Sequence, residues 1–110
     1  MYLSLIDCSL NSKDCDIIAT SEVFKLLRNL DLSCNHIGLE GLIILSDSNM
    51  SLIDSVEELI LFNCGIDLPE DHSGGQLSLG FFSDLWELNL SHNSLKLWPL
   101  LPPSIEHLSL

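Results

Sequence analysis

Residues 27–37 read LRNLDLSCNHI, a stretch in which apolar side chains and one asparagine occupy regularly spaced positions. Leu27, Leu30 and Leu32 are followed by Asn35 and Ile37, which gives the frame Leu-x-x-Leu-x-Leu-x-x-Asn-x-Ile. Leucines that alternate with polar residues are typical of a strand with one buried face. The stretch therefore predicts a short strand followed by a turn.

The same frame recurs along the chain. Residues 56–66, VEELILFNCGI, place Cys64 where the first stretch has Asn35, and residues 85–95, LWELNLSHNSL, place Asn93 there. Partial copies of the frame stand at both ends of the sequence, with matching positions at Leu3, Leu5, Cys8 and Leu10 and at Ile105, Leu108 and Leu110. The chain is therefore internally repetitive.

The spacing of the copies indicates a repeat array. The leading strand leucines are Leu3, Leu30, Leu59, Leu88 and Leu108, which follow one another at intervals of 27, 29, 29 and 20 residues. Periods of about 20 to 29 residues with this pattern are typical of stacked strand-containing repeats. We predict strands near residues 3–5, 30–32, 59–61, 88–90 and 108–110 within one domain that covers residues 1–110.

The sequence resembles the leucine-rich-repeat family over nearly its whole length. The spacings of 27 and 29 residues, with Gly41 in the tail NHIGLEGLIIL, are similar to the ribonuclease-inhibitor subtype. The resemblance implies an α/β leucine-rich-repeat solenoid of about 4.5 repeats, a right-handed β-α superhelix with a curved parallel sheet and convex helices or extended segments. It also implies that Cys8 and Cys64 are accepted alternatives to asparagine at the turn.

The last repeat departs from that subtype. Residues 94–110, SLKLWPLLPPSIEHLSL, contain Pro99, Pro102 and Pro103, and proline lacks the amide donor that a helix interior needs. We therefore expect an extended segment there. Elsewhere the pattern predicts an amphipathic helix over residues 14–27, a short helix over 39–45, a polar loop over 46–51 and a mobile loop over 69–76, with Phe81, Phe82 and Leu85 closing the core.

Composition narrows the function classes. Sixteen acidic and four basic residues give the 110-residue chain a net charge of −12, and 46% of its residues are hydrophobic. A chain so poor in clustered Lys and Arg is unsuited to nucleic acid and to an anionic membrane surface. The chain should fold and should favour a basic protein as its partner. Four cysteines without paired spacing and no secretory signal favour the cytoplasm or the nucleus.

No pattern of chemical residues predicts an enzyme. Cys34 and His36 lie close together, but no paired cysteine motif that would suit zinc accompanies them. Ser91, His92 and Asp84 lack the strained strand-to-helix turn that exposes a nucleophile. We therefore predict no catalytic residues, no metal and no cofactor.

The concave face of the sheet is the predicted binding surface. Side chains that alternate with the buried leucines face away from the core. Asp31, Glu58 and Glu87 are expected to form an acidic row beside Ile60 and Phe62, with Asn89 next to them. A charged surface with an aromatic anchor suits a protein interface, so the leading hypothesis is a protein–protein interaction scaffold.

Two alternatives stay open at this stage. The repeats could be structural spacers of a larger regulator, inhibitor or effector and have no binding role of their own. The sequence also begins and ends in predicted strands without polar caps. Such ends suit either a fragment of a longer array or self-association through the uncapped terminal strands, because an open strand edge is a template for pairing.

Overall fold

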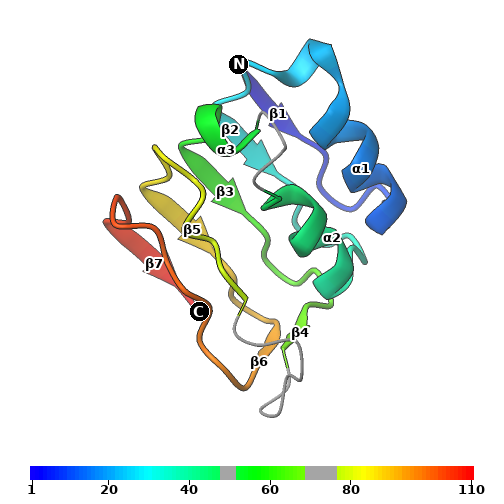
Figure 1. The fold of residues 1–110 in the computed structure, drawn as a ribbon. Helices are drawn as coiled ribbons and strands as arrows, with labels where there is room; N and C mark the ends of the chain where they lie inside the picture. The colour runs from blue at the N-terminus through cyan, green and yellow to red at the C-terminus, as the bar shows by residue number, and fades with distance from the viewer. Residues whose placement is uncertain (48–51, 69–76) are drawn as a thin grey trace.

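The computed structural model describes residues 1–47, 52–68 and 77–110. Its centre is a five-stranded parallel sheet in the order β1-β2-β3-β5-β7 (Figure 1). The strands are β1 (Tyr2–Ser4), β2 (Asn29–Asp31), β3 (Glu58–Ile60), β5 (Glu87–Asn89) and β7 (His107–Ser109). The α/β class and the parallel sheet predicted from the sequence are thereby confirmed.

The strand register follows the sequence repeat. Leu3 lies opposite Leu30, Leu30 opposite Leu59, Leu59 opposite Leu88, and Leu88 opposite Leu108. Each strand starts one residue earlier than the predicted range, because the residue before the leading leucine also pairs. A second, two-stranded parallel sheet joins β4 (Asp67–Leu68) to β6 (Ser94–Leu95).

Helices connect the first three strands of the large sheet. They are α1 (Ser12–Thr20), the 3-10 helix η1 (Glu22–Phe24), α2 (Gly38–Leu45) and α3 (Leu52–Ser55). Figure 1 shows α1 and α2 beside one another on the same side of the sheet. The short α3 was not predicted. The predicted polar loop lies partly outside the described residues, and the predicted mobile loop over residues 69–76 lies wholly outside them.

The single helix predicted over residues 14–27 is wrong, because two helices occupy this segment. The first of them, α1, starts at Ser12, since Asn11 and Asp14 form a capping box. It ends at Thr20 because Ser21 has an extended backbone, and the Ser21 hydroxyl then accepts a hydrogen bond from the Val23 backbone that starts η1. The predicted helix is thus interrupted at Ser21, a serine that caps the next helix.

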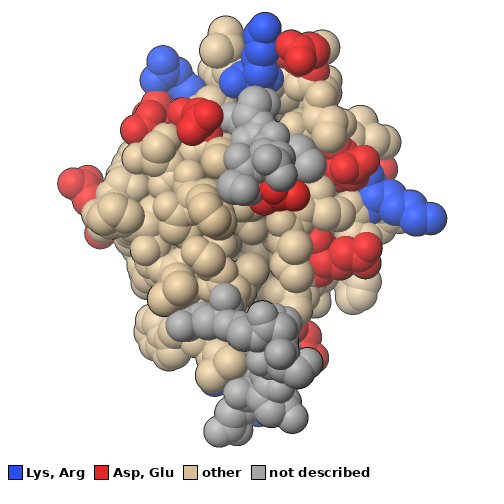
Figure 2. Space-filling model, in the orientation of Figure 1, with Lys and Arg blue, Asp and Glu red and all other residues tan. Residues whose placement is uncertain are grey.

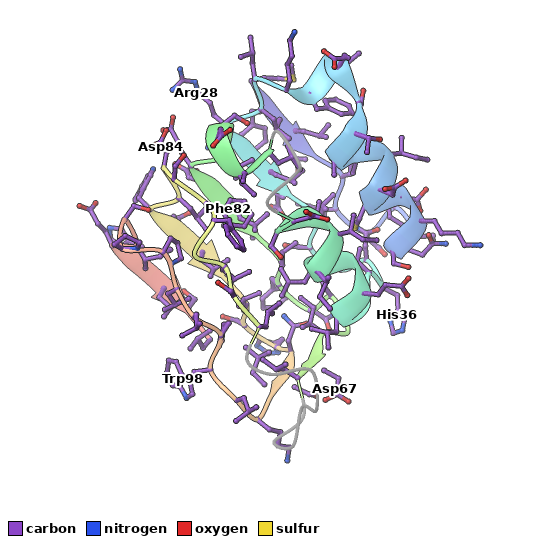
Figure 3. The ribbon with its side chains drawn as sticks, in the orientation of Figure 1. Arg28, His36, Asp67, Phe82, Asp84 and Trp98 are labelled. Atoms are coloured by element: carbon purple, nitrogen blue, oxygen red, sulfur yellow. The ribbon has the colours of Figure 1, made fainter. Side chains whose placement is uncertain are left out.

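The core lies between the sheet and the helices. The paired leucines of the central strands are 0–1% exposed: Leu30, Leu32, Leu59, Leu61, Leu88 and Leu90. Figure 3 shows Phe82 pointing into this layer, where it is 1% exposed. Leu85 is buried as predicted, but the inclusion of Phe81 in the core was wrong, since 55% of it is exposed. Burying each leucine contributes roughly 1.5–3 kcal/mol.

The segment between β6 and β7 contains no helix, as its prolines predict. Ser104 ties this segment to the core by donating a hydrogen bond from its hydroxyl to the Leu85 carbonyl at 2.6 Å. Earlier in the same segment, Leu100 forms an isolated parallel bridge with Ser78. The last repeat is shorter than the others because an extended chain advances farther per residue than a helix does.

Candidate binding surface on the sheet

The open face is the side of the five-stranded sheet that faces away from the buried leucines. Its residues are those that alternate with the leucines in the strands and at their exits. Register places them in three rows that cross the strands: Tyr2, Asn29, Glu58, Glu87 and His107; then Ser4, Asp31, Ile60, Asn89 and Ser109; then Ser33, Phe62 and Ser91. Every residue predicted for the binding surface belongs to one of these rows.

The predicted arrangement of the acidic side chains needs a correction. Glu58 and Glu87 lie opposite each other in the first row, but Asp31 lies in the second row, opposite Ile60. The cause is position along the strand, since Asp31 ends β2 whereas each glutamate begins its strand. Asp31 therefore lies one row away from Glu58 and Glu87, and the predicted straight row was wrong.

Neighbouring polar groups hold two of these carboxylates. Asp31 Oδ1 accepts hydrogen bonds from the Ser33 backbone at 3.0 Å and from the Ser33 hydroxyl at 2.6 Å. Glu58 accepts one from the Asn29 side-chain amide. These donors are neutral, so they orient the carboxylates without cancelling their charge.

An aromatic pair lies at the exit of β3. The rings of Phe62 and His92 have centroids 4.6 Å apart and are tilted by 52°. Phe62 is half-buried and has the short side chains of Ser33 and Ser91 on either side. The sequence analysis did not predict that His92 contacts Phe62. The signal was available, because His92 follows Phe62 by one repeat period plus one residue.

The other edge of the face carries a second aromatic contact. His107 lies opposite Glu87, and the centroid of its ring lies 5.4 Å from that of the Trp86 ring. Asn89 accepts a hydrogen bond from the Ser91 backbone at 2.9 Å, which shapes the exit of β5. The predicted contact residue Asn89 is therefore also part of the turn.

Two asparagines fix the strand exits below the open face. Asn35 Oδ1 accepts hydrogen bonds from the backbones of Cys8 and Leu10, and Asn93 Oδ1 accepts them from Cys64 and Ile66. Each side-chain amide also donates to three carbonyls. The turns need this support because, in all four repeats, the residue before the asparagine or cysteine of the frame has a left-handed backbone. These residues are Asp7, Cys34, Asn63 and His92.

Two of the four cysteines, Cys15 and Cys64, are buried. All four cysteines are free. Burial raises the pKa of the Cys15 thiol to about 12, with a contribution from the nearby Cys64. Burial likewise raises the pKa of the Cys64 thiol to about 11, and that thiol lies 3.1 Å from the Leu32 carbonyl. Both groups stay protonated at neutral pH and are poor nucleophiles.

A charged hollow at the start of the strands was missed by sequence reasoning. Arg28 directly precedes β2 and Glu57 directly precedes β3, and the two form an ion pair at 2.6 Å. They line a cavity of about 390 Å³ together with Met1, Leu26, Asp54, Ser55 and Asp84. Figure 3 shows Arg28 and Asp84 on the same margin of the molecule. In Figure 2 the charged side chains lie mostly around the rim of the visible face.

Residues with reactive side chains do not gather into a chemical site within the described ranges. Asp84 precedes β5 whereas His92 follows it, so the strand separates two groups that a catalytic triad would need together. No set of three or more His, Cys, Asp or Glu residues that could hold a metal occurs among residues 1–47, 52–68 and 77–110. In the same part of the chain, no helix is long and apolar enough to cross a membrane.

Comparison with known proteins gives one match. The Leucine Rich Repeat family model matches residues 84–108, which contain β5, β6 and the start of β7. Neither the curated proteins nor the solved structures gave a significant match to the chain. This match supports the repeat that the frame predicts. Leucine-rich repeats are usually non-catalytic and typically bind proteins, and no catalytic family is indicated.

Proposed function

We propose that this chain is a leucine-rich-repeat solenoid segment, similar to the ribonuclease-inhibitor subtype, that binds a partner protein on the open face of its sheet. The observation that carries the proposal is the composition of that face. Its centre combines the apolar Ile60 and Phe62 with Asp31, Glu58 and Glu87, and among the described residues no helix covers it. Apolar anchors beside charged groups are typical of protein interfaces.

The charge of the chain favours a basic partner. A net charge of −12 attracts a cationic protein over long range, and the carboxylates of the open face would then meet its basic side chains. Free thiols in a chain of this kind suit the reducing conditions of the cytoplasm or the nucleus.

A binding comparison between matched variants tests the proposal. The open-face variant combines Phe62→Ala with Glu58→Lys, and the control combines Ile17→Ala with Asp16→Lys on α1. Ile17 is 63% exposed, so the control removes a comparable apolar side chain and makes the same change of charge on the helix side. We expect the open-face variant alone to lose the proteins that the unchanged chain recovers from a cell extract. Equal recovery by all three proteins would contradict the proposal.

The alternative is a structural spacer that joins further repeats or a second copy. Among the described residues, strands β1 and β7 each pair on one side only, so either edge offers backbone groups to another parallel strand. Sedimentation velocity over a range of protein concentrations tests self-pairing. A sedimentation coefficient that rises with concentration would support it, and a monomer at the highest concentration would contradict it.

A further inference from the structure

The exposed apolar side chains of the described residues are concentrated at the two ends of the five-stranded sheet. The strands at those ends are β1 and β7, which lie at opposite edges in Figure 1. Before β2, the large apolar residues that are exposed are Met1, Tyr2, Ile6, Ile17, Val23 and Leu26. After β6 they are Trp98, Leu100 and Leu110, whereas the described parts of the repeats between them expose Ile43 and Phe81. Apolar surface that gathers in this way marks an interaction site.

The rows of buried leucines are also open at both ends. Leu90 is 1% exposed, whereas Leu110, the next residue in the same row, is 44% exposed. Leu3 and Leu5 are only partly buried as well, since β1 pairs on one side only in the described structure. A hollow of about 250 Å³ lies at the β7 end, and most of the residues that line it are apolar: Asn93, Leu95, Leu97, Trp98, Pro99 and Leu110. A further strand on either edge would bury more of these side chains.

The backbone pattern defines which strand fits the β7 edge. One hydrogen bond recurs across the sheet, from the nitrogen of the second strand leucine of a repeat to the oxygen of the residue that follows the first strand leucine of the next repeat. The pairs are Leu5 with Asp31, Leu32 with Ile60, Leu61 with Asn89, and Leu90 with Ser109. Leu110 is the next donor in this series, and the acceptor position in the first repeat is Ser4. β1 of a second copy therefore supplies the acceptor that the series requires, in the register that places Leu3 opposite Leu108.

The distribution of charge favours contact between unlike ends of the array. Residues 1–28 contain three of the four basic residues and four acidic ones, so their net charge is 3 − 4 = −1. Residues 29–110 contain one basic and twelve acidic residues, so their net charge is 1 − 12 = −11. Two β7 ends would therefore repel each other more strongly than a β7 end repels the first repeat of another copy.

From these observations we propose that the 110-residue chain stacks end to end, with β1 of one copy added as a parallel strand beside β7 of another. The contact continues the packing between repeats inside one copy. It joins two different edges, so copies can add one after another. Figure 1 shows α1 next to β1 on the helix side of the sheet. A helix is about 10–12 Å across and strands are about 4.8 Å apart, so α1 is wide enough to cover its own β1 and the neighbour's β7.

This inference goes beyond the proposed function and does not depend on it. The open face lies on the other side of the sheet from α1 and stays uncovered when copies stack. The β1 and β7 edges are joined, and the rows of the open face continue from one copy to the next.

Two proline variants, each of which blocks one edge, test the proposal by sedimentation velocity. Ser4→Pro removes an amide donor from β1, and Leu110→Pro removes the next donor of the series on β7. Alternate residues of a strand bond to opposite sides, and the Leu5 nitrogen and the Ser109 oxygen already bond to strands of the same copy. Both removed amides therefore face the open edge, where proline is tolerated.

The expected result is complementation between the two variants. The unchanged protein should form species that grow with concentration, whereas each proline variant alone should stay monomeric. An equimolar mixture of the variants should form a dimer and nothing larger, because one intact edge of each kind remains. Assembly of either variant alone would mean that like edges pair, and it would overturn the inference. A monomeric mixture of two folded variants, or an unchanged protein that stays monomeric at the highest concentration, would overturn it too.

A matched pair of lysine variants keeps the test decisive if a proline variant does not fold. Leu110→Lys places a charge on the apolar β7 end, and Ile43→Lys makes the same change of charge at an exposed apolar residue of α2. Leu110→Lys should weaken self-association at least about 3-fold, because stacking would desolvate the added charge, and Ile43→Lys should not weaken it. Equal self-association of the two lysine variants would overturn the inference.

Discussion

Asn93 holds the backbone of Cys64 from 29 residues farther along the chain, with its Oδ1 2.9 Å from the Cys64 nitrogen. The same amide donates to the Leu61 carbonyl at 2.8 Å, so one side chain joins the exits of β3 and β5. Asn35 makes the equivalent bonds to the first repeat. The asparagine of the frame therefore links neighbouring repeats as well as shaping its own turn.

Replacing either asparagine should destabilise the protein strongly. Asn35→Ala or Asn93→Ala removes all the side-chain bonds at the turn and leaves several backbone groups without partners, which should cost about 2–4 kcal/mol. Asn35 should give the larger effect because it is only 2% exposed. Urea unfolding followed by circular dichroism measures the loss.

Asn89→Ala is the matched control for this experiment. Its side chain accepts a hydrogen bond from the Ser91 backbone at a half-exposed site, so we expect a loss below about 1 kcal/mol. Comparable losses for Asn89 and Asn93 would show that the asparagines do not act as links between repeats.

The strand positions could be predicted because each copy of the frame contains the alternating leucines that specify a strand. Alternating leucines specify a strand with one buried face, and their recurrence aligns the strands, as the pairing of Leu30 with Leu59 shows. Helix ends were less predictable. The break at Ser21 depends on a local hydrogen bond that competes with the apolar pattern of residues 14–27, and such competition is invisible to periodicity.

The candidate binding surface was predictable in membership but not in arrangement. Alternation identified the residues that face away from the core, whereas the offset of Asp31 from Glu58 and Glu87 depends on which strand position each acid occupies. The contact between Phe62 and His92 required the left-handed backbone at His92, which turns the chain at the strand exit. The cavity beside Arg28 could not be foreseen, since it depends on how α3 and the segment before β5 pack.

Gly65 is a position where adding one methyl group should clearly lower the stability of the protein. Its φ is +67°, and a β-carbon there would lie 2.8 Å from two ring atoms of His36. We expect Gly65→Ala to destabilise the protein by about 1–3 kcal/mol, from the left-handed backbone and from the clash together. Chemical denaturation measures the change.

A double-mutant cycle separates the two causes. His36→Ala removes the ring, so Gly65→Ala should cost about 1 kcal/mol less in that background, and the remaining loss reports the backbone strain. Gly80→Ala is the control, because Gly80 lacks a left-handed φ and its nearest contact would be the Ser78 hydroxyl at 3.3 Å. An unchanged cost of Gly65→Ala without the ring would rule out the steric contribution of His36.

The capping box of α1 should set the stability of that helix. Asn11 Oδ1 accepts a hydrogen bond from the Lys13 backbone at 2.9 Å, and Asp14 Oδ2 accepts one from the Asn11 backbone at 2.8 Å. Asn11→Ala should cost about 1 kcal/mol and Asn11→Ser much less, since serine is also a good N-cap. Thermal unfolding of the two variants gives the comparison, and equal melting temperatures would contradict the capping role.

The buried thiols should make the protein less stable in alkaline solution. Burial raises the pKa of Cys15 to about 12 and that of Cys64 to about 11, so the folded state keeps both thiols protonated where the unfolded chain ionises them near pH 9. The free energy of unfolding is therefore unaffected by these groups below about pH 9 and falls as the pH rises toward their folded-state pKa values. Each thiol lowers it by up to about 1.4 kcal/mol per pH unit in that window.

Cys64→Ser tests this dependence, because serine can still donate to the Leu32 carbonyl but does not ionise in this range. Between about pH 8.5 and 10.5 the variant should lose about 1–2 kcal/mol less stability than the unchanged protein. Cys8→Ser is the control, because it makes the same substitution at an exposed cysteine. Urea unfolding at several pH values gives the slopes. If Cys64→Ser and the unchanged protein lose stability in parallel, the Cys64 thiol is not the group whose ionisation opposes folding.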